Sequence, residues 1–167
     1  MATLDETGLR IRDAAAAITG LGPAIEAGRP WPLSTHFGVE PEASWGPLET
    51  LAHVAEMIPY WLGQMELILD ADEPLEFGRV QSDAVRIGLI ERDRILPPRE
   101  LLARIAADAG RLAARLGELS QEDGDRIGLH PTLGEISVGG IAERFIAGHL
   151  EDHVRQVEAI LEGVSSR

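Results

Sequence analysis

Residues 47–69 read PLETLAHVAEMIPYWLGQMELIL, and the pattern of this stretch indicates the fold class. Its apolar residues fall on nearly every side of a helix with 3.6 residues per turn, so they do not form a single stripe. A helix of this kind is buried on most sides, as the central helix of a bundle is. Pro47 suits a first helical turn, whereas Pro59 inside the stretch predicts a kink. The sequence therefore predicts an all-α bundle packed around residues 47–69.

Helical spacing covers much of the remaining chain, and no stretch alternates in the way that a strand does. The other predicted helices span residues 4–17 with a weaker continuation to Ala27, 83–94 after a cap at Ser82, 98–119 after Pro97, and the stretch from Ser137 to Leu161 with a stop at Gly163. Residues 31–46 are rich in proline, serine and glycine, which predicts an ordered loop across the molecule. Such a loop can roof a site.

The composition narrows the class of function. The length of 167 residues fits one domain over 1–167, and a net charge of −13 disfavours nucleic acid and anionic membranes as partners. There is no secretory signal pattern and no apolar run long enough to span a membrane, so we expect a cytoplasmic protein. The chain has no cysteine, so any catalytic thiol must come from a separate molecule. Small molecules or other proteins remain as partners.

Two histidines lie four residues apart on the inward stripe of the last helix. His149 and His153 take positions where an apolar residue would be expected, and an unpaired buried imidazole costs roughly 1 to 3 kcal/mol. Residues four apart on a helix can converge on one metal ion, which would offset that cost. Leu150 follows the first histidine where a metalloprotease helix has its glutamate. The spacing alone also fits core histidines that hydrogen-bond within the protein.

A third histidine, His53, lies inside the apolar stretch quoted above. Alone it would be read as a satisfied core residue. Together with His149 and His153, however, it completes a set of three imidazoles from two helices, which leaves open positions on a metal for water or substrate. The interior of a helix bundle is a common place for such a site.

Two stretches carry a resemblance to a known family. SWGPLETLAHVAEM (44–57) and LHPTLGEISVGGIAERFIAGHLEDH (129–153) resemble the signatures of the DinB-like proteins, which include YfiT-type hydrolases and mycothiol-dependent maleylpyruvate isomerases. The resemblance implies a four-helix bundle with one long crossover connection and a short additional helix. It also implies that His53, His149 and His153 bind a divalent metal ion, commonly zinc or nickel, and that the protein forms a homodimer.

Two hypotheses for the function follow. In the first, the ion activates a water or a low-molecular-weight thiol such as mycothiol or bacillithiol, for hydrolysis, isomerisation or thiol transfer on a small electrophile. Glu49 and Glu56, one turn either side of His53, would then orient the imidazole or act as acid or base, unless they are solvated surface acids. In the second, the bundle is a non-catalytic, stress-associated or ligand-binding protein, and a fourth protein ligand completes the coordination of its metal.

The sequence does not decide between these hypotheses. The substrate, the identity of the metal and the choice between water and thiol stay open. Arg144 is a candidate contact for an anion and His130 a candidate neighbour of the cavity, but the spacing does not fix which way either side chain faces.

Overall fold

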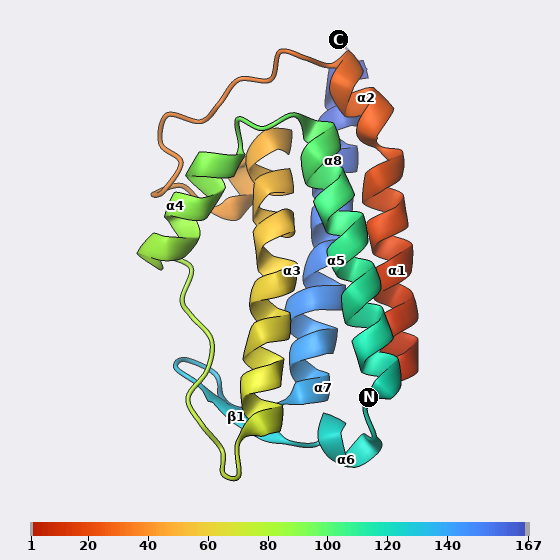
Figure 1. Cartoon of the computed structure of the whole chain (residues 1–167). Coiled ribbons are helices and arrows are strands. Elements are labelled where there is room, and N and C mark those ends of the chain that lie inside the picture. Colours follow the sequence, from red (N-terminus) through yellow and green to blue (C-terminus); the bar gives the residue numbers. More distant parts are fainter. Residues whose placement is uncertain (1, 166–167) are drawn as a thin grey trace.

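The computed structural model describes residues 2–165, and four long helical runs pack in it as a bundle (Figure 1). Three of them are α1 (Leu4–Gly20), α3 (Pro47–Asp70) and α5 (Pro98–Glu118). The fourth is continuous through α7 (Val138–Gly140), a π-helical segment (Ile141–Gly148) and α8 (His149–Ser165). The shorter helices are α2 (Gly22–Ala27), α4 (Ala84–Asp93) and α6 (Gln121–Gly124). The predicted four-helix bundle is confirmed.

The order of the helices requires a long crossover. Both α1 and α3 pack against α5 and against the last helical run, so α1 and α3 lie diagonally across the bundle. The loop between them crosses one end of the molecule, as predicted, and contains a 3-10 turn at Glu42–Ser44. Figure 1 shows that α3 and α5 run in the same direction, because the chain between them returns along the outside of the bundle.

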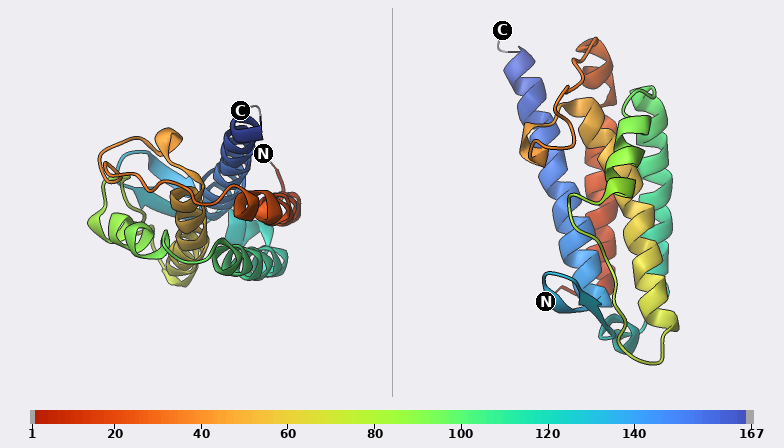
Figure 2. Two further views of the ribbon diagram at one scale, coloured as in Figure 1. Left: turned by 90° about the horizontal axis from the view of Figure 1, so that it is seen from above. Right: turned by 90° about the vertical axis from the view of Figure 1, so that its left-hand side faces the viewer.

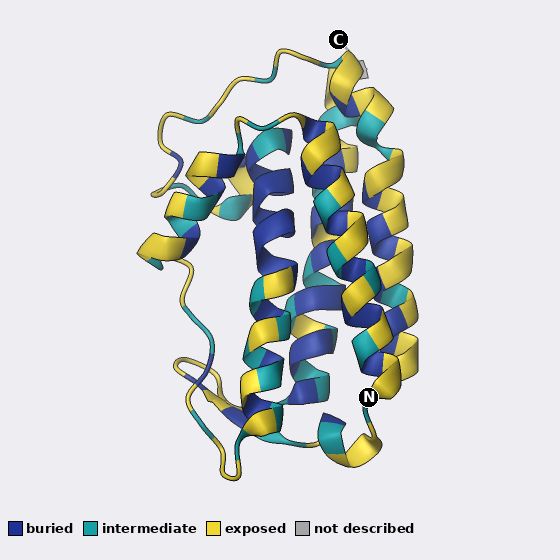
Figure 3. Cartoon of the chain, viewed as in Figure 1, coloured by how far each residue is buried: buried dark blue, intermediate teal, exposed yellow. Residues whose placement is uncertain are grey.

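The central position of α3 follows from its sequence. Every residue from Glu49 to Ile58 is buried, so this half of the helix is surrounded by protein (Figure 3). Pro59 lies on the exposed side, and the helix continues through it to Asp70. Among the described helices, none combines the length and the hydrophobicity that a bilayer span needs.

The structure contains a small hairpin that the sequence did not predict. Strands β1 (Ile127–His130) and β2 (Gly134–Ser137) pair antiparallel, with Gly134 in the left-handed region at φ 75°. Strands of four residues are too short to show an alternating pattern, so the sequence pattern did not predict this hairpin. Three local predictions were also wrong: residues 121–124 form α6 in a region expected to be a loop, Asp83 and not Ser82 caps α4, and α8 continues past Gly163 to Ser165.

The returning chain between α3 and α4 is tied to this hairpin. The N–H of Phe77 donates to Leu129 O at 3.1 Å, and the N–H of Leu129 donates to Leu75 O at 2.9 Å. Gly78 follows with φ 87°, and a Cβ there would lie 2.6 Å from the His130 ring. The crossing loop, the returning chain and the hairpin gather on the side of the bundle formed by α3 and the last helix (Figure 2). Gly78 thus lets the returning chain pass close to His130.

We predict that Gly78→Ala lowers the free energy of unfolding by about 1 to 3 kcal/mol, the usual cost of a side chain held at positive φ. The matched control is Gly63→Ala in the exposed part of α3, where a Cβ meets nothing within 4 Å. That change should raise stability by roughly 0.5 to 1 kcal/mol, because alanine favours a helix over glycine. Urea unfolding of both variants measures the difference, and equal effects would contradict the role given to Gly78.

Candidate metal centre

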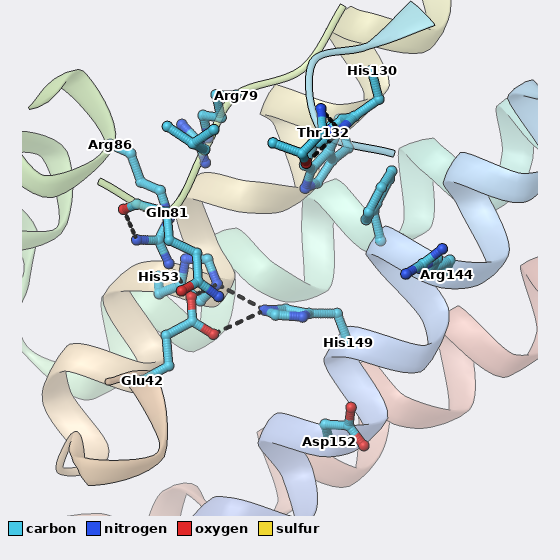
Figure 4. Close-up of a pocket in the computed structure, with 13 residues that line it drawn as sticks. Glu42, His53, Arg79, Gln81, Arg86, His130, Thr132, Arg144, His149 and Asp152 are labelled. Carbon is cyan, nitrogen blue, oxygen red and sulfur yellow. Dashed lines mark hydrogen bonds and ion pairs between the residues drawn. The ribbon is translucent and has the colours of Figure 1, made fainter. Parts of the chain in front are cut away.

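Three imidazoles from two helices meet inside the bundle. His53 comes from α3, and His149 and His153 come from successive turns at the start of α8 (Figure 4 draws the first two). The Nε2 atom of His149 lies 3.0 Å from Nε2 of His53 and 2.9 Å from Nε2 of His153. His53 and His153 are buried, whereas 33% of the His149 side chain is exposed. The centre therefore opens to solvent on the side of His149.

The far nitrogens of two of these rings are hydrogen-bonded. Nδ1–H of His53 donates to Glu56 Oε1 at 3.0 Å, and Nδ1–H of His153 donates to Gln156 Oε1 at 2.9 Å. Each acceptor is fixed in turn, Glu56 by Arg79 and Gln156 by its own amide donating to Glu42 O. A neutral imidazole that carries its proton on Nδ1 has a lone pair on Nε2. Both lone pairs therefore point to the interior of the cluster.

Glu42 is a fourth member of the cluster, and the sequence analysis missed it. Its carboxylate oxygens lie 3.5 Å from Nε2 of His53, 3.4 Å from Nε2 of His149 and 3.8 Å from Nε2 of His153. Glu42 belongs to the 3-10 turn of the crossing loop, where no helical spacing links it to a histidine. The available signal was the prediction that this loop roofs a site, together with an acidic residue three positions before Trp45.

The protein environment keeps the cluster ready for a cation. Burial and the neighbouring imidazole of His149 lower the pKa of His153 to about 4, and burial lowers the pKa of His53 as well. Burial alone would raise the pKa of Glu42, but the contact with His149 and the charges around it outweigh burial and bring the pKa to about 2. At neutral pH the site thus offers the neutral imidazoles of His53 and His153 and the carboxylate of Glu42.

The geometry of these donors fits a divalent metal ion. Each of the four residues offers one ligand atom, and all four atoms lie within 4.8 Å of one another. Imidazole nitrogens held about 2.1 Å from one ion at angles of 90° to 109° would be roughly 3.0 to 3.4 Å apart. The measured separations of 3.0 and 2.9 Å are close to this range. Without a cation, Nε2–H of His149 can donate to only one of its two partners, so the lone pair of the other buried imidazole would lack a donor.

The two glutamates singled out from the sequence have different places. Glu56 contacts His53, as described, and two of its contacts come from Arg79 at 2.6 Å. Glu49 instead accepts from the Ser34 N–H at 2.8 Å and from Arg94 at 3.1 Å. These contacts attach the crossing loop and the end of α4 to α3. Glu49 therefore supports the loop that carries Glu42, and it is not part of the cluster.

A cavity of about 630 Å³ lies against the exposed side of the cluster (Figure 4). His53, His149 and Glu42 form one part of its lining, and Trp61, Phe145 and His130 form an aromatic part. The rings of Trp61 and Phe145 are stacked with centroids 4.6 Å apart, and those of Phe145 and His130 are 5.4 Å apart. The cavity is large enough for a small organic molecule, which can reach the ligand atoms.

Comparison with known proteins places the chain in a family and identifies a structural relative. The sequence profile of the DinB superfamily matches residues 4–157. YfiT from Bacillus subtilis, described as "a probable metal-dependent hydrolase with an unusual four-helix bundle topology", has a similar structure with a TM-score of 0.71. The match covers 99% of this chain and 91% of that chain at 16% sequence identity, so it shows a shared fold. No curated protein matches the chain significantly.

The lowered pKa values predict how stability depends on pH in protein stripped of metal. The pKa of His153 is about 4 in the folded state, below its ordinary value of 6.5, so the unfolded chain binds the proton more readily. The free energy of unfolding should therefore fall as pH drops from 6.5 towards 4, by up to about 1.4 kcal/mol per pH unit for each such group. Urea unfolding at several pH values should show a smaller slope for His153→Gln. The control is His36→Gln on the exposed loop, and an unchanged slope in His153→Gln would contradict the prediction.

Proposed function

This chain belongs to the DinB superfamily, and we propose that it is a divalent-metal-dependent enzyme that acts on a small electrophile. The proposal rests on one observation: three imidazole nitrogens converge at the edge of a cavity that is large enough for a small organic molecule. A site built only to join helices has no need of such a cavity. His53, His149 and His153 are the proposed ligands, with zinc or nickel as the ions that suit imidazole donors.

The bound ion would supply a Lewis acid that polarises an electrophile or lowers the pKa of a water or thiol beside it. The residues of the chain have separate tasks in this proposal. Glu56 and Gln156 position the rings of His53 and His153, and are positioning residues. Glu42 faces both the cluster and the cavity, so it is the carboxylate best placed to accept a proton from a nucleophile.

Two candidates for the nucleophile fit the chain. The likeness to YfiT, itself described as a probable metal-dependent hydrolase, supports water and hence hydrolysis. A low-molecular-weight thiol such as mycothiol or bacillithiol is the second candidate, and it would give isomerisation or thiol transfer. Because the chain has no cysteine, that thiol must enter the cavity from solution.

A non-catalytic role is the alternative, and the position of Glu42 favours it. With Glu42 as a permanent fourth ligand, three imidazoles and one carboxylate would complete a tetrahedral site with no open position. The metal would then join α3, α8 and the crossing loop in a stress-associated or ligand-binding bundle. The two roles differ in whether a small molecule can enter the coordination sphere.

We predict that the purified protein binds about one divalent ion per chain and that His149→Ala and His153→Ala lose it, because each removes one of three imidazole ligands. Metal content after dialysis against zinc or nickel measures the loss. His36→Ala is the matched control, since it removes an exposed loop histidine and should keep the ion. An intact triad that stays empty in excess metal would sink the proposal.

A cobalt-substituted protein distinguishes the two roles. We expect 2-mercaptoethanol to change the visible spectrum of the cobalt protein, because three imidazole ligands leave a coordination position open to an incoming ligand. Glu42→Gln should keep this response and bind metal at least about 10-fold more weakly, the loss typical when a supporting carboxylate is removed. A spectrum that does not respond to the thiol, together with a large fall in melting temperature on chelation, would favour the structural role.

A further inference from the structure

The helix that carries two of the histidines changes its geometry just before them. Residues Ile141–Gly148 form a π-helix, and the α-helical geometry resumes at His149. In a π-helix each residue is hydrogen-bonded to the residue five positions away, so residues five apart lie about one turn from each other, on the same side of the helix. Arg144 and His149 are five apart. In an α-helix the same two positions would point about 140° apart, at 100° per residue.

The π-helical segment therefore brings Arg144 to the face that carries His149. Both residues line the same cavity, as does Asp152 one turn further along α8 (Figure 4). The sequence pattern alone did not fix the direction of Arg144, because α-helical spacing would have directed it away from His149.

Arg144 differs from the other charged residues of the cavity because no described residue neutralises it. Arg79 is paired with Glu56, Arg86 with Glu42, and Asp152 with Arg155. Arg144 makes neither a hydrogen bond nor an ion pair with the described part of the chain, and its guanidinium lies 5.8 Å from the ring centre of Phe145. Arg144 is exposed to solvent, so the unpaired positive charge lies at the edge of the cavity, in a protein whose net charge is −13.

The groups around Arg144 do not compete for its charge. Glu143, the preceding residue, forms an ion pair with Arg10 at 3.7 Å. His130 is buried, which lowers its pKa, and the nearby charge of Arg144 lowers it further, so His130 is neutral at physiological pH. The remaining neighbours are the aromatic rings of Phe145 and Trp61. A small anion would find a free guanidinium beside neutral and apolar surfaces.

We propose that the cavity binds a small organic carboxylate whose anionic group is held by Arg144 while its reactive end lies beside His149. The placement of the reactive end beside His149 rests on the proposed function. The binding of the anionic group depends only on Arg144. The carboxylate can belong to the thiol or to the electrophile, since both would occupy the same cavity. The register of the π-helix, which sets Arg144 and His149 on one face, is the structural basis of this selectivity.

The test compares ligands that differ only in charge. Calorimetry on the zinc-loaded protein would measure 3-mercaptopropionate against 3-mercaptopropanamide, and succinate against succinamide. We expect the carboxylate of at least one pair to bind about tenfold more tightly, which corresponds to about 1.4 kcal/mol. Preference within the thiol pair alone assigns the carboxylate to the thiol, and preference within the succinate pair alone assigns it to the other substrate.

Variants then attribute the preference to one residue. Arg144→Gln should abolish it, and Arg144→Lys should retain part of it. Arg99→Gln is the matched control, because it removes the same charge from an exposed position at the start of α5. Equal binding within both pairs, no binding of any ligand, or the same preference in Arg144→Gln would overturn the inference. Cobalt uptake by Arg144→Gln separates this failure from a failure of the metal site, since that variant keeps all four cluster residues.

Discussion

The centre depends on two hydrogen bonds made on the far side of its imidazoles. Nδ1–H of His53 donates to Glu56 and Nδ1–H of His153 donates to Gln156, and both acceptors are fixed by further contacts. These bonds leave the lone pairs of two Nε2 atoms facing one point in a buried site. Such an arrangement is unfavourable unless a cation occupies that point. We therefore expect the packing of α3 against α8 to depend on whether a cation occupies the site.

The charges of the site come largely from the segments that connect the bundle helices. The crossing loop brings Glu42, the returning chain between α3 and α4 brings Arg79, and α4 brings Arg86. The helices supply the rigid framework and the imidazoles, whereas the connections supply the groups that surround a ligand. Because connections change more readily than a packed core, the groups around a ligand can vary while the bundle and its imidazoles are kept.

Sequence reasoning reached the parts of this protein that follow helical periodicity. The apolar stretch 47–69 gave the buried central helix, and the four-residue spacing of His149 and His153 placed them together. Glu56 was within reach because it lies three positions after His53 on a helix. Glu42 was not, since its approach depends on how a loop folds back over the bundle. The hairpin was too short for its pattern to be recognised, and α6 is a single turn fixed by the capping box of Ser120.

The π-helical segment shows why α-helical spacing was not sufficient. His149 and His153 need α-helical geometry, because only there do residues four apart lie one turn from each other and reach one ion. Arg144 needs π-helical geometry, because it lies five positions before His149. A helix that was α-helical throughout would direct Arg144 away from His149. A helix that was π-helical throughout would separate the side chains of His149 and His153. Since π-helical segments are rare and are found frequently at functional sites, we interpret the change of geometry at His149 as a feature of the cavity beside the candidate metal centre.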